Sequence, residues 1–185
     1  MIARDVRPAA PALDRTILGM FLFIASEAIF FLSIVVAYLA SREPGLADAR
    51  ANLDLGRTAI FSVALFSSSA TVAVANARRD VRWLGATMLL GAIFLVGQGS
   101  EYARLATIGI GPSSALFGTT FFTLTGLHGA HVLVGLIALA ALAAATTRRT
   151  RGVGPITWEA VSLYWHFVDA VWVVVFSVVY LGTFL

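Results

Sequence analysis

The chain has 185 residues, a length typical of one domain, but 59% of them are hydrophobic and only 12% are charged. A soluble domain carries about 25% charged residues. The mean hydropathy of +0.88 and the long apolar blocks exclude a soluble enzyme, a nucleic-acid-binding module and a disordered chain. We therefore predict an integral membrane protein.

The charged and sulfur-containing residues narrow the possibilities further. All thirteen basic residues are arginines, the net charge is only +3, and no basic run alternates with aromatics, so the arginines indicate membrane topology rather than nucleic-acid binding. The absence of cysteine excludes disulfides, thiolate metal sites, iron–sulfur clusters and covalent haem attachment. Three histidines remain as soft metal ligands.

Five segments are long and apolar enough to cross a membrane, which takes about 20 residues of α-helix. They are residues 17–40, 58–77, 83–101, 116–145 and 158–185. Short polar connections join them. We predict an all-α membrane protein in which one bundle of five transmembrane helices forms a single domain over residues 1–185.

The distribution of arginine predicts the orientation of this bundle. Nine arginines fall on the side of the N-terminus and four on the opposite side, and basic residues near spans are retained in the cytoplasm. The N-terminus is therefore predicted to be cytoplasmic and the C-terminus outside. The four on the outer side are Arg42, Arg50, Arg57 and Arg104.

Polar residues inside the spans are the candidate functional residues, because ionisable groups in hydrocarbon are costly and usually face the protein interior. The main candidates are Glu27, His128, His131, His166 and Asp169. Gln98, Glu101, Glu159 and Ser162 are expected to extend them into an interior polar network.

Spacing and depth support this expectation. Glu159, Ser162, His166 and Asp169 follow one another at i, i+3, i+7 and i+10, which places them on one face of a helix. With a rise of about 1.5 Å per residue, Glu27 and Asp169 both lie roughly 15 Å into their spans, near the midplane. They are either fixed packing partners or direct participants in proton movement. For the histidines, interhelical hydrogen bonds are favoured over haem or metal ligation.

Four motifs in order resemble subunit III of the haem–copper respiratory oxidases, as in cytochrome c oxidase. They are GMFLFIASEAIFF (Gly19–Phe31), GQGSEY (Gly97–Tyr102), GTTFFTLTGLHGAHVLVG (Gly118–Gly135) and WEAVSLYWHFVDAVWVVVFSVVYL (Trp158–Leu181). Together they cover most of the chain. The HGxHV and WHFVD blocks are specific as a pair.

The resemblance implies an integral subunit that binds no haem, copper or other metal itself and has no catalytic residue. Haem and copper would lie in partner subunits, and the expected partners are the catalytic subunit I and subunit II. The chain would stabilise subunit I and support proton uptake and dioxygen access, in a bacterial plasma membrane. Glu27 matches the family's buried carboxylate, and His128, His131, Glu101, Glu159, His166 and Asp169 match its other polar positions.

The chain departs from the long form of the family, which has seven spans, because the first two are missing. This short form is typical of bacterial oxidases. Family members also bind phospholipid in a cleft that those two helices help to wall, so bound phospholipid here depends on another subunit, such as a small one in their place.

Three other functions compete with that of an oxidase subunit. A subunit-III-like accessory protein of nitric oxide reductase shares the five-span plan and most of the motifs. A stand-alone transporter is disfavoured because no segments mirror one another and no proline interrupts a span. A membrane metalloenzyme is disfavoured because His128 and His131 share a face without a further ligand group.

Overall fold

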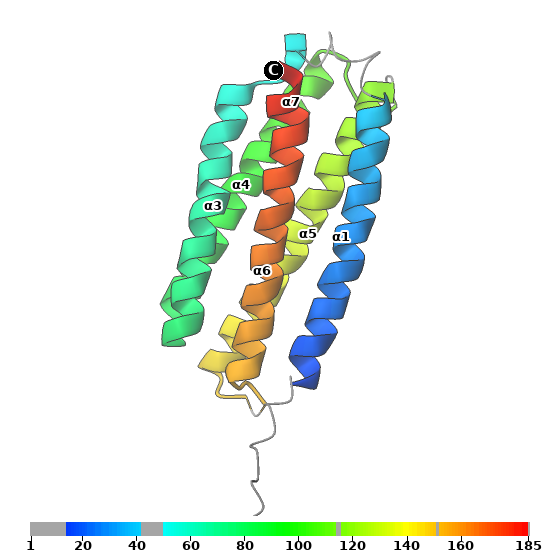
Figure 1. Cartoon of the computed structure of the whole chain (residues 1–185). Helices are drawn as coiled ribbons and strands as arrows, with labels where there is room; N and C mark the ends of the chain where they lie inside the picture. Colours follow the sequence, from blue (N-terminus) through cyan, green and yellow to red (C-terminus); the bar gives the residue numbers. More distant parts are fainter. Residues whose placement is uncertain (1–13, 42–49, 114–115, 151, 185) are drawn as a thin grey trace, which may run out of the picture.

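The computed structural model describes residues 14–41, 50–113, 116–150 and 152–184. Within these ranges the regular structure is helical, with no strand, and five long helices lie side by side in one bundle (Figure 1). The helices are α1 (Arg15–Ser41), α3 (Leu55–Arg78), α4 (Val81–Thr107), α5 (Leu116–Thr147) and α6 (Pro155–Phe176). All five are long and apolar enough to span a membrane, which confirms the predicted fold class.

The helices extend beyond the predicted apolar segments because polar residues form their first and last turns. Asp54 caps α3, where its side chain accepts a 2.9 Å hydrogen bond from the backbone N–H of Arg57. Asp80 caps α4 in the same way through the N–H of Arg82 at 2.9 Å. The chain continues past α6 through a π-helical turn, η2 (Ser177–Leu181), into the short helix α7 (Gly182–Phe184).

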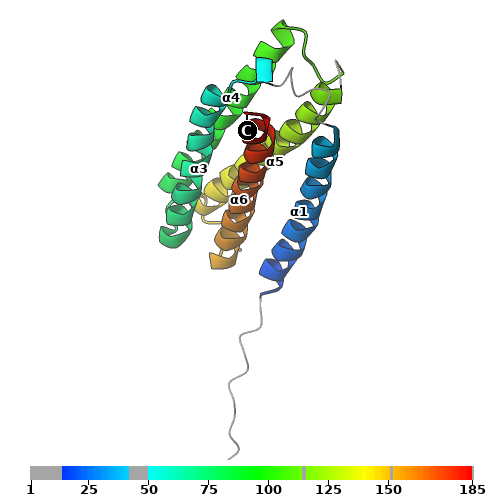
Figure 2. The same ribbon diagram turned by 45° about the horizontal axis from the view of Figure 1, so that its top comes forward.

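Helix α6 occupies the centre of the bundle. It packs against α1, α3 and α5, while α5 also packs against α1 and α4. The turned view separates the α3–α4 pair from α1, which stands at the opposite edge (Figure 2). The tight turn at Asp80 between α3 and α4 makes these two helices antiparallel neighbours.

Helix α1 is the least covered of the five. Its outward side presents large apolar residues such as Leu22 and Ile29, which are 66% and 71% exposed. A helix that is apolar on its outer side fits lipid or another membrane protein rather than water. The start of α1 and the end of α7 lie at opposite ends of the bundle (Figure 1).

Candidate functional site

An acid–imidazole pair links α1, the helix at the edge of the bundle, to its neighbour α5. Glu27 projects from the middle of α1, and its Oε2 lies 3.2 Å from Nε2 of His131 in the middle of α5. Both side chains are largely covered, with exposed fractions of 23% and 17%. The structure therefore brings together two of the predicted site residues from segments a hundred residues apart.

The hydrogen bond made by the other ring nitrogen of His131, Nδ1, determines how many protons the pair holds. Its Nδ1 lies 2.9 Å from the carbonyl oxygen of Leu127, and a carbonyl can only accept, so Nδ1 must carry a hydrogen. The contact between Nε2 and Glu27 then needs one further proton, on either the carboxyl or the imidazole. The pair is thus a neutral acid with a neutral imidazole or a carboxylate with an imidazolium.

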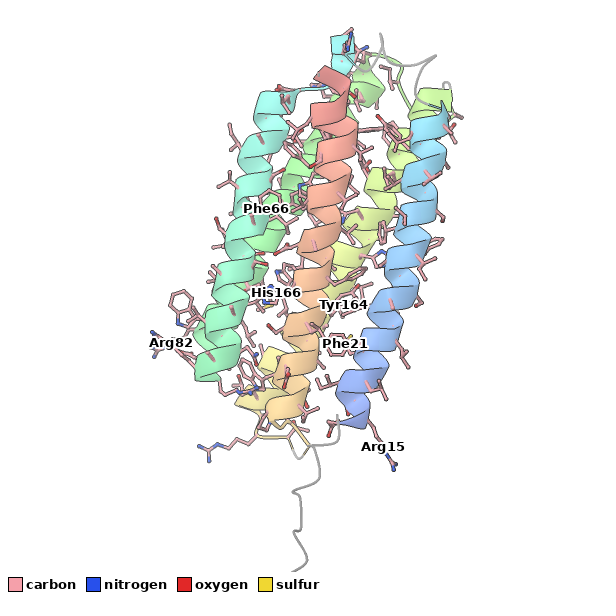
Figure 3. The ribbon with its side chains drawn as sticks, in the orientation of Figure 1. Arg15, Phe21, Phe66, Arg82, Tyr164 and His166 are labelled. Carbon is pink, nitrogen blue, oxygen red and sulfur yellow. The ribbon has the colours of Figure 1, made fainter. Side chains whose placement is uncertain are left out.

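Aromatic side chains enclose the pair. The ring of Phe31 meets the His131 ring edge-on, with 4.9 Å between centroids. The hydroxyl of Tyr164 on α6 donates a 3.3 Å hydrogen bond to the backbone carbonyl of His131 (Figure 3 labels Tyr164). Phe31 borders the imidazole itself, whereas Tyr164 holds the backbone of the residue that carries it.

An apolar groove begins beside the pair, between α1 and α6. It holds about 320 Å³ and is lined by Phe31, Val35, Phe167 and Val171, among other apolar residues. Phe31 belongs both to this groove and to the wall around His131. Phe31 is thus shared by the groove and the wall of the pair, while neither Glu27 nor His131 lines the groove.

The polar face predicted on the last span packs mainly against α3. His166 lies between these helices, where its Nδ1 is 2.9 Å from the hydroxyl of Ser69 (Figure 3). Asp169 is 5% exposed, and neither carboxylate oxygen makes a hydrogen bond of normal geometry to the described residues. The Ser69 hydroxyl also lies near this carboxyl.

Glu159 differs from the expectation of an interior position. It is exposed and lines a groove of about 280 Å³ together with Asn76, Ser162 and His166. The reason is its place in the second turn of α6, near the end of the bundle, where a carboxylate can reach water without an interior partner. Ser162, one turn further on, is buried as expected.

His128 also differs from the expectation, which was an interhelical hydrogen bond. It is fully buried, and neither ring nitrogen has a hydrogen-bond partner in the described part of the chain. Its ring instead stacks on Trp172 of α6 with 4.8 Å between centroids and meets Phe94 of α4 edge-on at 5.7 Å. His128 therefore acts as an aromatic core residue, and it does not share the site of His131.

Gln98 and Glu101 form two separate networks on α4. Nε2 of Gln98 donates to the carbonyl of Thr125 at 2.6 Å and to the hydroxyl of Tyr102 at 2.9 Å. The buried carboxylate of Glu101 pairs with Arg104 at 2.5 Å. Arg104 also donates to the carbonyl of Asn52, which fastens the segment before α3 to α4.

The sequence did not single out several partners of these residues, namely Ser69, Tyr102, Arg104, Thr125 and Tyr164. Two of them could have been found, because Tyr102 follows Gln98 by four residues and Arg104 follows Glu101 by three, spacings that bring side chains together on a helix. The others come from different helices. Among residues that the structure describes, no three His, Cys, Asp or Glu side chains lie together as a metal site.

The fold and the site define a class of protein: a bundle of five membrane-spanning helices that turns most of the acids and imidazoles of its spans inward. A family model described as cytochrome c oxidase subunit III matches residues 11–183. The chain is 35% identical to cytochrome c oxidase subunit 3 of Corynebacterium diphtheriae, over 88% of this chain and 85% of that protein. The chain belongs to the cytochrome c oxidase subunit III family.

Two other relatives agree. Cytochrome c oxidase subunit 3 of Bacillus subtilis is 35% identical, over 89% of this chain and 84% of its own length. Cytochrome bo(3) ubiquinol oxidase subunit 3 of Pseudomonas aeruginosa is 34% identical, over 90% of this chain and 84% of its own length. Membership in this family confirms a subunit III of a haem–copper oxidase in respiratory electron transport, and it does not favour the nitric oxide reductase accessory protein.

Proposed function

We propose that the chain is a non-catalytic integral subunit of a haem–copper terminal oxidase, which stabilises the catalytic subunit and supports its proton uptake and dioxygen supply. Its partners are subunits I and II, which carry the haem and copper, and its membrane is the bacterial plasma membrane, with the start of α1 on the cytoplasmic side. A small subunit in place of the two missing helices is a further candidate partner.

The observation that carries this proposal is the Glu27–His131 pair. One proton is held between a carboxyl and an imidazole midway along two spans, a place where an ionisable group is costly to keep. The pair can pass this proton between its two members without breaking the contact to Leu127. A site of this kind can take up and release protons beside a partner subunit.

The apolar groove between α1 and α6 supports the second part of the proposal. Dioxygen is apolar and concentrates in hydrocarbon, and a groove lined by Phe31, Val35 and Val171 offers it a path along the protein. The same groove fits a phospholipid acyl chain.

The test uses the intact oxidase complex with Glu27→Gln. The glutamine amide keeps the size of the side chain and can still donate to Nε2 of His131, but it cannot release a proton. We expect normal assembly on a native gel, together with slower proton uptake or a complex that loses activity sooner during turnover. Glu27→Ala should show the same functional loss.

A matched control on the same helix is Ser33→Ala. Ser33 is exposed, and among the described residues its hydroxyl bonds only to the carbonyl of Phe30, at 2.6 Å, so its removal should change neither assembly nor activity. If Glu27→Gln matches Ser33→Ala in proton uptake and in lifetime during turnover, the pair has no role in proton movement and the proposal loses its support.

A further inference from the structure

A small cavity lies between α3, α4 and the π-helical turn η2, toward the end of the bundle where α7 lies (Figure 1). Its polar lining includes Thr58, Gln98, Glu101 and Tyr180, and the space open to the centre of a water molecule is about 10 Å³. A cavity needs roughly 10 to 15 Å³ by this measure to hold one water molecule. The space therefore fits a single small molecule and excludes a lipid or an organic ligand.

Aromatic side chains form the remaining walls of this cavity. The ring of Phe61 on α3 lies against the backbone of Gly97 on α4, so closely that a β-carbon on Gly97 would overlap it. Phe94 and Trp172 form another wall, with 4.8 Å between their ring centroids. Arg57, which is exposed, completes the lining. The polar side chains therefore share a narrow space that is mostly apolar elsewhere.

Two hydroxyl groups meet at the cavity. Those of Thr58 and Tyr180 lie beside each other, although the residues belong to α3 and η2, and both side chains are buried. Neither hydroxyl has another hydrogen-bond partner among the described residues. Each hydroxyl carries one hydrogen. Because one O–H group at most is used between the two, at least one remains to donate to a third group.

Glu101 brings an acceptor to the same cavity. Its buried carboxylate lies close enough to Tyr180 to act on it electrostatically. A carboxylate has about four acceptor sites. Nε and Nη2 of Arg104 and the backbone N–H of Asp54 occupy three of them. One site of Glu101 is therefore left to accept a further hydrogen bond.

Gln98 brings a second acceptor. Its Nε2 donates to the backbone carbonyl of Thr125, which can only accept, so the orientation of the amide is determined. The other amide atom, Oε1, is buried and has no hydrogen-bond partner in the described part of the chain. A buried acceptor left in this way costs free energy. Gln98 therefore needs a donor that the neighbouring side chains do not supply.

We propose that this cavity binds one water molecule. Its two hydrogens suit the free acceptors of Gln98 and Glu101, and its oxygen can accept from the hydroxyl of Tyr180 or Thr58. Buried waters typically make about three hydrogen bonds to groups that otherwise lack partners. This water joins α3, α4 and η2, and it connects the hydrogen bonds of Gln98 with the Glu101–Arg104 pair.

The charges around the cavity favour water over a metal cation. All-oxygen sites also suit hard cations, but here Arg104 already pairs with the carboxylate of Glu101. Arg57 adds a second positive charge to the lining. A bound cation would be repelled by both guanidinium groups, whereas neutral water is not.

The test is a high-resolution electron cryomicroscopy map of the intact oxidase complex. We expect a density peak at about 2.7 to 3.2 Å from at least three of the four side-chain oxygens, the distances of hydrogen bonds. A map that shows ordered waters elsewhere in the chain but no peak here would overturn the proposal. A peak at about 2.3 to 2.6 Å from its oxygen neighbours, as for bound calcium, would also overturn it.

Variants test which groups hold the water. Thr58→Val and Tyr180→Phe each remove one hydroxyl with little change of shape, whereas Thr58→Ser keeps it. Thr123→Val is the matched control, because its hydroxyl is exposed and bonds to a carbonyl of its own helix, that of Thr119, at 2.7 Å. We expect the peak to weaken or vanish in the first two variants and to persist in Thr58→Ser and Thr123→Val. A peak of unchanged strength in both hydroxyl-deficient variants would contradict the proposed hydrogen bonds.

Stability gives a second measurement. Loss of the water leaves buried acceptors unpaired, so Thr58→Val and Tyr180→Phe should raise the unfolding equilibrium constant of the full chain about 5- to 30-fold over that of Thr123→Val. Equal constants for all three variants would contradict the proposal. The map of the parent complex decides the matter even where a variant folds poorly. Neither measurement depends on proton uptake, so both stand apart from the role of Glu27.

Discussion

The indole ring of Trp165 on α6 lies directly against Gly91 on α4. A β-carbon on Gly91 would come within 2.7 Å of the ring. A β-carbon on Gly135 of α5 would come within 2.8 Å of the same ring. One fully buried tryptophan of the central helix therefore contacts a glycine on each of two neighbouring helices, and these contacts set how closely α4, α5 and α6 approach.

Gly91→Ala is expected to destabilise the chain by about 1 to 3 kcal/mol, the usual cost of an extra carbon in a close-packed interior. Gly85→Ala on the same helix is the control, because a β-carbon there meets nothing within 4 Å. It should be neutral or slightly stabilising, since alanine favours helix over glycine. Unfolding in mixed detergent micelles measures both, and equal stabilities would show that Trp165 can shift.

Ser68→Ala is expected to cost about 1 to 3 kcal/mol. The Trp165 indole N–H donates a 2.8 Å hydrogen bond to the Ser68 hydroxyl, and both groups are buried. Removing the hydroxyl leaves a buried donor without a partner. Ser67→Ala changes the exposed neighbour on the same helix and should have no effect. The same unfolding assay compares them, and matched values would mean that the indole N–H finds another acceptor.

Losing Arg104 should lower the stability of the chain more than losing its partner, Glu101. The side chain of Glu101 is 4% exposed and that of Arg104 is 32% exposed. Arg104→Met leaves a buried carboxylate without its cation and should cost about 3 kcal/mol or more. Glu101→Gln leaves a partly exposed arginine that still binds the carbonyl of Asn52, so its cost should be smaller. A larger loss of unfolding free energy for Glu101→Gln than for Arg104→Met, measured in the same unfolding assay, would contradict this order.

Much of the fold could be predicted from the sequence because hydrocarbon admits only apolar helices of sufficient length. The five spans, the tight connection at Asp80 and the inward-facing Ser162 all follow from apolar length, turn residues and helical spacing. The ends of the helices could not be placed as well, since capping residues such as Asp54 lie outside the apolar segments.

Sequence spacing could not predict which side chains of different helices contact one another. Counted at about 1.5 Å per residue, His131 lies roughly 20 to 25 Å from the cytoplasmic end of its span and Glu27 roughly 15 Å. The structure nevertheless brings them to 3.2 Å, because helices tilt and shift along one another. The same limit applies to His128. Its place against Trp172 depends on the packing of α5 on α6, and a motif with two histidines gives no sign that only one of them has a polar partner.

A chain of hydrogen bonds with one possible direction links α4 to α5. The Gln98 amide can only donate to the Tyr102 hydroxyl, and the Phe121 carbonyl can only accept from Thr125, at 2.7 Å. Tyr102 must therefore donate to the Thr125 hydroxyl, 2.7 Å away. Gln98→Leu and Tyr102→Phe should each weaken the contact between α4 and α5, and the double variant should lose less than the two losses combined. The coupling between these two side chains of α4 should be about 0.5 to 1.5 kcal/mol, the usual net contribution of one hydrogen bond. Strictly additive losses in the unfolding assay would show that the two side chains act separately.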